Sequence, residues 1–347
     1  KDLKSAKKYI FLEYFIISNE GTMWTQILNI LKEKAKNGVE VRVMYDDMGC
    51  LPLLPENYQK YLESLNIKCV VFNKLKMFKG IFMNNRDHRK ITVIDGNIAY
   101  TGGLNLSDEY INKKIKYGYW KDNAIKLQGN SVWNLTIMFL SLWNSYKKED
   151  KDYLKFKTTD NLKIKPNGYL SAYASVPING VLEGEDVYLN IINKATKYVY
   201  IITPYLIIDT DMINSIILAF KRGVDVRIVI PGIPDKKIVY DLTMSYVKNL
   251  VDAGIKVYTY TPGFIHSKIF VSDDNKATVG TINLDYRSLY LHFENGVYLE
   301  DVKEIEDILN DVNNILTESH LLTKKETNYN IFRKVWQSIL RFFAPLF

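Results

Sequence analysis

The stretch HRKITVIDGNIAYTGGLN, residues 88–105, has a second copy in the same chain, HSKIFVSDDNKATVGTIN at residues 266–283. Five residue types recur at one offset of 178 positions, the difference between 88 and 266. The pairs are His88 and His266, Lys90 and Lys268, Asp95 and Asp273, Gly102 and Gly280, and Asn105 and Asn283. A single His-x-Lys arises readily by chance, whereas five matched residue types at one offset indicate a duplicated unit.

The similarity between the two halves extends upstream of these motifs. AKKYIFLEYFI at 6–16 resembles ATKYVYIITPY at 195–205, and each ends in an apolar run typical of a buried strand. LKEKAKNGVEVRVMYDD at 31–47 resembles ILAFKRGVDVRIVIPGI at 217–233, where a helix stops at Gly38 or Gly223 before a second strand. Each half is therefore predicted to run strand, helix, strand, and then a hairpin that carries the motif.

These patterns predict an α/β fold of two lobes, each a mixed, mostly parallel β-sheet flanked by helices. The lobes are expected to pack face to face about an approximate two-fold axis and to share one active site. A charged stretch that ends in Pro166 and Gly168 marks the join. The predicted division is an N-terminal lobe at 1–150, a linker region at 151–170, a C-terminal lobe at 171–325 and an amphipathic helix at 326–347.

The repeated residue types suit chemistry on a phosphate. In a strand, His and Lys at positions i and i+2 lie on one face, so both side chains of each motif can reach one anion. Two lysines and two asparagines, Asn105 and Asn283, would converge as donors on its oxygens. One histidine can attack phosphorus while the other protonates the leaving alcohol. The alternative is that the histidines merely end strands and the lysines merely lie on the surface. Because both copies of the motif are intact, this alternative is disfavoured.

Composition narrows the partners without choosing among them. The formal net charge of +7 favours an anionic partner, either nucleic acid or an acidic lipid surface. The two cysteines form no zinc cluster and the sequence has no P-loop, so neither a metal nor another cofactor is predicted. No apolar run is long enough to span a membrane. Because the first residue is Lys1, we expect an N-terminal anchor upstream of this sequence.

The doubled pattern HxKxxxxDxxxxxxGxxN resembles the signature of the phospholipase D superfamily. Stretches such as GVEVRVMYDDMG, TGGLNLSDEY and VGTINLDYRSL look like those of bacterial cardiolipin synthases, and the resemblance covers essentially the whole chain. It implies a phosphatidyltransferase that joins two phosphatidylglycerol molecules into cardiolipin and releases glycerol through a phospho-histidine. It also implies a location at the bacterial cell membrane.

The resemblance further implies roles for individual residues. Acidic residues downstream of the motifs, Asp122 in YWKDN and Glu294 in HFENG, would each hold a catalytic imidazole. The motif residues Asp95 and Asp273 would tie a turn instead of touching substrate. Where the superfamily often has Ser, this chain has Gly103 and Thr281, so a hydroxyl contact to phosphate is expected only from Thr281. Family precedent makes His88 the nucleophile and His266 the acid and base.

Two flanking segments favour lipid over nucleic acid. KLKMFKGIFMNNR at 74–86 mixes lysines with large apolar residues, although a buried strand would read similarly. IFRKVWQSILRFFAPLF at 331–347 has the spacing of a basic amphipathic helix, suited to a membrane surface or to docking on the core. The sequence shows no basic stripe with exposed aromatic residues of the kind that binds single-stranded nucleic acid. The predicted partners are phosphatidylglycerol and a membrane surface, with the oligomeric state unknown.

Two other readings stay open at this point. The same motif serves hydrolytic phosphodiesterases, either phospholipase D or nuclease, because the motif does not fix the substrate. A catalytically silent membrane scaffold is the third reading, and two intact motifs argue against it.

Overall fold

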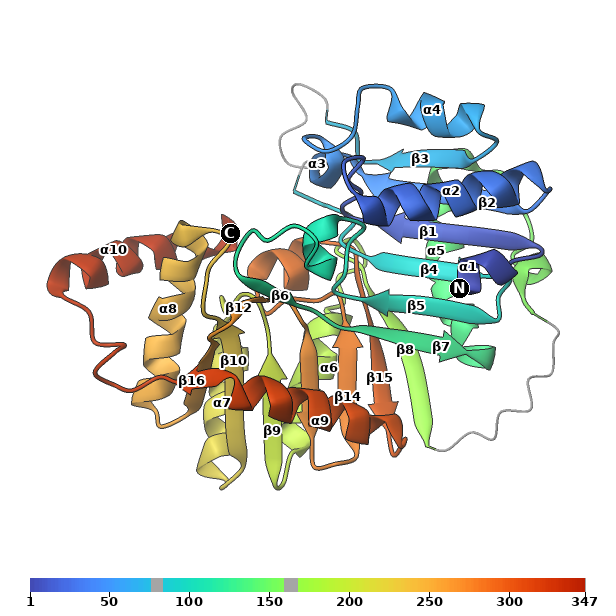
Figure 1. Cartoon of the computed structure of the whole chain (residues 1–347). Helices are drawn as coiled ribbons and strands as arrows, with labels where there is room; N and C mark the ends of the chain where they lie inside the picture. Colours follow the sequence, from blue (N-terminus) through green and yellow to red (C-terminus); the bar gives the residue numbers. More distant parts are fainter. Residues whose placement is uncertain (76–83, 159–167, 347) are drawn as a thin grey trace.

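A computed structural model describes residues 1–75, 84–158 and 168–346 of the chain. Two mixed β-sheets, each flanked by helices, form two lobes that contact each other along one side (Figure 1). The described order confirms the predicted α/β class and the predicted repetition of strand, helix, strand and hairpin in each half.

The first lobe is built on a six-stranded sheet of order β3-β2-β1-β4-β5-β7. Its strands are β1 (Tyr9–Tyr14), β2 (Glu40–Asp46), β3 (Lys68–Phe72), β4 (Lys90–Ile94), β5 (Ile98–Gly102) and β7 (Ala124–Gln128). Its helices are α1 (Asp2–Ser5), α2 (Thr22–Lys36), α3 (Asp47–Cys50), α4 (Tyr58–Ser64) and α5 (Val132–Lys147), with short 3-10 turns η2 (Asp108–Ile111), η3 (Gly129–Ser131) and η4 (Leu154–Phe156).

The second lobe is built on an eight-stranded sheet of order β16-β11-β10-β9-β13-β14-β15-β8. Its strands are β8 (Tyr169–Ser175), β9 (Tyr198–Ile202), β10 (Asp225–Pro231), β11 (Lys256–Tyr260), β13 (Ile269–Ser272), β14 (Lys276–Gly280), β15 (Glu294–Glu300) and β16 (Ser319–Leu321). Its helices are α6 (Glu183–Lys194), α7 (Thr210–Lys221), α8 (Lys237–Asp252), α9 (Glu304–Thr317) and α10 (Ile331–Phe342), with the short π-helix η5 (Arg287–Leu291) and the 3-10 turn η6 (Ala344–Leu346).

The expectation of mostly parallel sheets is wrong. In each main sheet only three consecutive strands run parallel, β1 with β2 and β3, and β9 with β10 and β11. The motif hairpin and the strand after it then add antiparallel pairs, such as β1 with β4 and β4 with β5. In the motif hairpins the reason is chain connectivity, because a short turn joins β4 to β5 and β13 to β14 and permits only antiparallel pairing. The parallel strands are joined through helices instead.

The main apolar core is shared by both lobes. Helix α5 contacts β4 and β5 of its own sheet and also β8 of the other sheet. Phe139 of this helix stacks on Phe11 of β1 with ring centroids 4.6 Å apart. The same continuous cluster of buried residues includes Ile315 of α9 and Val271 of β13. The lobes are therefore packed on one another through side chains, not merely connected by the chain.

The segment between the lobes begins inside this core. Phe156 is buried and packs edge-on against Tyr9, with ring centroids 5.2 Å apart. Residues 159–167 lie outside the described residues. The chain next enters β8 at Tyr169. We propose the division into two lobes joined through 151–170, with the residues up to Phe156 packed on the first lobe.

The two motif aspartates bind backbone N–H groups at the start of the central strand of each sheet. Asp95 accepts from Lys7, Lys8 and Tyr9 at 2.7–2.8 Å. Asp273 accepts equivalently from the backbone N–H groups of residues 196, 197 and 198 at 2.7–2.9 Å. Both aspartates have positive φ, 52° and 54°, which Asp tolerates better than most residues. They lie at the ends of β4 and β13 that are remote from the motif histidines, which suits a structural role.

We predict that Asp273→Ala destabilises the second lobe. The substitution leaves three N–H donors without their carboxylate, so the free energy of unfolding should fall by about 1–3 kcal/mol in urea denaturation. Asp211→Ala, an exposed position in the first turn of α7, is the control and should change it by less than about 0.5 kcal/mol.

The effect of Asp273→Ala on the free energy of unfolding should also depend on pH. Burial alone raises the pKa of Asp273, but hydrogen bonds from Tyr198, Thr196 and Lys197 outweigh burial and lower it overall. A carboxyl with a lowered pKa stabilises the fold above its unfolded pKa and loses that contribution as pH falls. The stability gap between wild type and Asp273→Ala should thus narrow below about pH 4. A gap that widens on acidification would contradict this account.

Candidate active site

Each motif histidine is placed by backbone pairing with the other lobe. Strand β12 (Gly263–Ile265) leads into His266 and pairs in parallel with β6 (Tyr119–Lys121) of the first lobe. The N–H of His266 then donates to the carbonyl of Lys121 at 2.7 Å. In the mirrored arrangement, the N–H of His88 donates to the carbonyl of Phe293 at 2.9 Å. The residue that follows each of these acceptors is a predicted histidine-holding acid.

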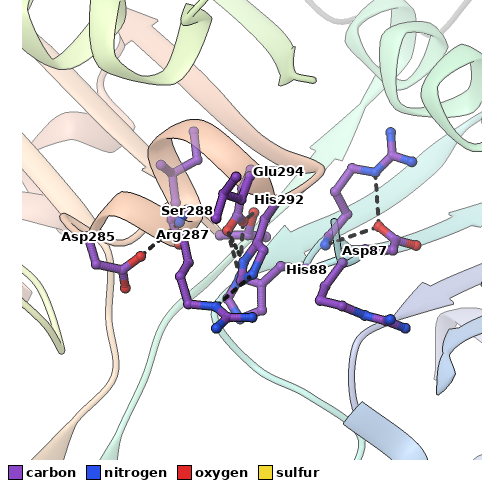
Figure 2. A network of polar contacts seen from close by, with 12 residues as sticks. Asp87, His88, Asp285, Arg287, Ser288, His292 and Glu294 are labelled. Carbon is purple, nitrogen blue, oxygen red and sulfur yellow. Dashed lines mark hydrogen bonds and ion pairs between the residues drawn. The ribbon is translucent and has the colours of Figure 1, made fainter. Parts of the chain in front are cut away.

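The acids therefore hold the histidines crosswise between the lobes. His88 Nδ1 lies 2.9 Å from Glu294 Oε1, and His266 Nδ1 lies 2.7 Å from Asp122 Oδ2. Figure 2 shows the first of these pairs. Both carboxylates are buried, at 0% and 1% exposure of the side chain. Because an ionised carboxylate only accepts, each Nδ1 carries the proton, and each Nε2 keeps its lone pair for chemistry.

The position that differs between the motifs, Gly103 and Thr281, lies against these acids. A Cβ on Gly103 would stand 2.0 Å from Asp122 Oδ1, so no side chain fits there. The Thr281 hydroxyl donates to Glu294 Oε2 and accepts from the N–H of Asn295 at 3.0 Å. Thr281 is not among the residues that line the cavity, and its hydroxyl contacts Glu294. The contact of this hydroxyl with phosphate stays a prediction.

One cavity of about 890 Å³ is lined by both histidines and by residues from both lobes. Asn105 and Asn283 line it as well, as the motif spacing predicts. Asn105 Oδ1 accepts from the N–H of Ile16 at 3.0 Å, and its Nδ2 donates to the Tyr110 hydroxyl at 2.8 Å. The structure thus brings the two histidines and the two asparagines of the doubled motif to a single space.

The two motif lysines lie buried behind the histidines. Lys90 Nζ donates to the carbonyl of His88 at 2.5 Å, and Lys268 Nζ donates to the carbonyl of His266. Burial lowers the pKa of Lys90 to about 7 and that of Lys268 to about 8, although Glu294 and Asp122 oppose the shifts. A bound anion would favour their charged forms.

The pKa values of both histidines lie below their ordinary value. Burial lowers the pKa of His88 well below its ordinary value, and the charges of Lys90 and Lys268 lower it further. Burial and Lys268 lower the pKa of His266 to about 4 against the opposing effect of Asp122. Unprotonated imidazoles beside buried lysines provide nucleophiles and an environment that is suited to an anion.

Two residues next to His88 were missed from the sequence, Arg287 and His292. Arg287 Nε donates to His292 Nε2 at 3.4 Å, and the His292 ring lies 5.6 Å from the His88 ring (Figure 2). Both residues line the cavity. Neither residue type is repeated in the first half. Glu109 stands 178 positions before Arg287, and Trp120 stands two before Asp122, as His292 stands two before Glu294. The comparison of the two halves therefore gave no signal for them.

His88, His292 and Glu294 form a group that sequence reasoning also did not predict. Their ligand atoms lie within 4.8 Å of one another, so they could hold a metal ion. Arg287 at His292 and Lys90 at His88 place positive charge beside this group. This charge favours an anion over a cation at the same place.

Comparison with known proteins agrees with this geometry. A family model described as the phospholipase D-like domain of cardiolipin synthase matches residues 1–124 and 188–316. An uncharacterized protein of Streptococcus mutans is 47% identical over 347 residues, which are 100% of this chain and 75% of that protein. Cardiolipin synthase 1 of Staphylococcus aureus is 37% identical over 350 residues, covering 100% of this chain and 70% of that protein.

The fold also matches a solved structure. Phosphatidylserine synthase of Haemophilus influenzae superposes with a TM-score of 0.72 at 17% identity, over 99% of this chain and 89% of that chain. Its low identity supports the fold alone. On the family match and the sequence relatives, this chain belongs to the cardiolipin synthase family of phospholipase D-like proteins.

We predict that inorganic phosphate raises the pKa of His266 from about 4 towards its ordinary value of about 6.5. An anion near an imidazole favours the protonated form, and so the pKa must move upward. NMR titration of the imidazole carbons, assigned with a His266→Gln spectrum, would measure the change against chloride at equal ionic strength. A midpoint that phosphate leaves in place would contradict an anion site.

Proposed function

We propose that this chain is a phosphatidyltransferase that joins two phosphatidylglycerol molecules into cardiolipin and releases glycerol. The observation that carries the proposal is the pair of carboxylate-held histidines, each supported by the opposite lobe, at one shared cavity. Membership of the cardiolipin synthase family supports phosphatidyl transfer between phospholipids as the reaction class.

In the proposed first step, His88 Nε2 attacks the phosphorus of one phosphatidylglycerol. A P–N bond forms, the P–O bond to glycerol breaks, and His266 gives its proton to the leaving oxygen. Because the pKa of His266 is lowered to about 4, the phosphodiester anion must first raise that pKa and let His266 take up the proton. Glu294 and Asp122 keep the two imidazoles oriented throughout.

In the second step, His266 takes a proton from a hydroxyl of the second phosphatidylglycerol. That oxygen attacks phosphorus, the P–N bond to His88 breaks, and cardiolipin forms. Lys90, Lys268, Asn105 and Asn283 stabilise the charge on the phosphate oxygens in both steps. One phosphodiester replaces another, so the exchange needs no further energy source.

The geometry permits hydrolysis as well, and phospholipase D or nuclease activity is the alternative. Phosphatidylglycerol vesicles followed by mass spectrometry separate these outcomes. Cardiolipin with free glycerol supports the proposal, phosphatidic acid alone supports hydrolysis, and metal-independent cleavage of single-stranded DNA supports a nuclease.

The two histidines should differ in their response to alanine substitution. A phosphatidyl ester of p-nitrophenol needs no proton on its leaving group, so His266→Ala should still release p-nitrophenol in a burst and retain a phosphatidyl adduct. His88→Ala should form no adduct and lose activity by at least about a thousandfold. His320→Ala, an exposed histidine, is the control. An adduct on His266 in the His88→Ala protein would reverse the assignment.

The exposed face of α10 supports a membrane surface as a further partner. Its polar side packs inward, where Arg333 binds Asp241 at 2.6 Å and Arg341 Nε donates to the Ser245 hydroxyl at 2.9 Å. Its apolar side faces outward, with Phe332 83% and Phe342 81% exposed. The helix docks on α8, which was one expectation, and it still presents an apolar stripe, which supports the other.

A second feature connects this helix to the cavity. Leu346, just after α10, lines the cavity, and Figure 1 shows the chain end near the junction of the lobes. Within the described residues no helix is long and apolar enough to cross a bilayer. Most of the predicted lipid segment at 74–86 lies outside the described residues, because 76–83 are not described. We propose that the protein acts at the bacterial cell membrane.

We predict that Phe332→Ser with Phe342→Ser weakens binding to anionic vesicles by about tenfold or more, because each buried Phe contributes about 1.5–3 kcal/mol. Co-sedimentation with phosphatidylglycerol-containing vesicles measures the effect. Leu154→Ser with Ile178→Ser removes apolar side chains of similar exposure elsewhere, 64% and 76%, and should leave binding unchanged. Equal binding of both double variants would exclude α10 as the contact.

A further inference from the structure

The two halves carry opposite charges at one equivalent position of the cavity. Glu109 follows Asn105 by four residues, and Arg287 follows Asn283 by four. Both side chains line the same cavity and both are partly exposed. The backbone is duplicated up to Leu106 and Leu284, which make matching bridges to Ile17 and Leu206. Beyond them Glu109 lies in the 3-10 turn η2 and Arg287 begins the π-helix η5. A ligand with chemically unlike ends explains why the two halves differ here.

Arg287 belongs to the neighbourhood of His88. Its guanidinium is held through His292, which lies beside His88 and Glu294. A guanidinium at this place complements the phosphate that His88 attacks. Asp285 also lines the cavity, and its Oδ1 accepts a hydrogen bond from the backbone N–H of Ser288 at 2.7 Å (Figure 2).

Glu109 belongs to the neighbourhood of His266. The Ser107 hydroxyl donates to one of its carboxylate oxygens. The next residue, Tyr110, has its ring 5.6 Å from the His266 ring, and Trp120 lies 5.2 Å from His266. Trp120 stands two residues before Asp122, as His292 stands two before Glu294. At this equivalent position the His266 side thus carries a carboxylate beside aromatic rings, whereas the His88 side carries a guanidinium.

A phosphate in direct contact with Glu109 is disfavoured, whereas a polyol suits this place. A carboxylate repels a phosphodiester but accepts strongly from hydroxyl groups, and aromatic faces pack against C–H groups. We propose that Glu109, with Tyr110 and Trp120, forms a subsite beside His266 that binds the hydroxyl groups of a glycerol headgroup and sets the specificity for the alcohol. This inference rests on the proposed function and deepens it.

The subsite gives the two alcohols of the reaction one binding place. Glycerol leaving the first lipid and the headgroup of the second lipid would each lie against Glu109 with an oxygen near His266. A polyol then has contacts that water and simple alcohols lack, so it competes better for the phosphatidyl group on His88. The assignment of His266 to acid and base chemistry gains an argument that does not depend on family precedent.

An acceptor competition tests the subsite. The full chain is incubated with phosphatidylglycerol vesicles and equal concentrations of deuterated glycerol and 1-propanol, and mass spectrometry gives the ratio of the two labelled phospholipids. Wild type should favour glycerol, and Glu109→Gln should lower that ratio by about tenfold or more because a charged acceptor is lost. The ratio is internal to each sample, so a partly unfolded variant does not distort it.

Asp235→Asn is the matched control. Asp235 is another carboxylate at this cavity, and it accepts from the Tyr205 hydroxyl at 2.6 Å. An unchanged ratio in Glu109→Gln, or an equal fall in Asp235→Asn, would overturn the subsite while leaving transfer intact. Ethanolamine outcompeting glycerol through Glu109 would overturn the polyol assignment in favour of an ammonium site. If wild type forms no transfer product with any acceptor, the proposed function falls and the subsite with it.

Discussion

The crosswise pairing of histidine and carboxylate is the constraint on which the site depends. Glu294 of the second lobe holds His88 of the first, and Asp122 of the first holds His266 of the second. A hydrogen bond at 2.7–2.9 Å between buried groups tolerates little displacement. The lobes must therefore keep one relative position, and the shared apolar core with its helix α5 provides the packing that keeps it.

Buried charge around the first motif reinforces this position. Arg86 Nε binds Asp46 Oδ2 at 2.9 Å, and the N–H of Asp87 donates to the same carboxylate oxygen at 3.0 Å. Arg89 binds Glu13 Oε1 at 2.7 Å, so residues both before and after His88 in the sequence are anchored by buried ion pairs. Breaking such a buried pair leaves an uncompensated charge, which makes the local backbone resistant to displacement.

The duplicated motif made much of this arrangement predictable. Five matched residue types and their strand periodicity indicated two similar lobes and one site containing His88 and His266. Strand direction was less predictable, because antiparallel β7 and β15 return through connections whose length alone does not fix the pairing partner. The crossing of Asp122 and Glu294 between lobes also left no local signal. It depends on pairing between segments more than 140 residues apart, as from Asp122 to His266.

Differences between the halves were the hardest features to interpret from sequence. Thr281 has the hydroxyl that suits phosphate, yet its neighbour in space is Glu294, which no residue spacing reveals. The positions of the first half that correspond to Arg287 and His292 hold other residue types, so the search for repeats did not detect these two residues. In α10 the amphipathic pattern was plain, but which face would contact the protein depended on Asp241 and Ser245 of α8.

The crossing of acids between the lobes also bears on how such a chain can arise. A single-motif ancestor could complete its histidine only with a carboxylate from a second copy, so it would act as a symmetric dimer with two identical histidines. Fusion of the two copies into one polypeptide removes that symmetry requirement. Each half can then change independently of the other. In this sequence, equivalent positions of the two halves hold Gly103 and Thr281, and Glu109 and Arg287.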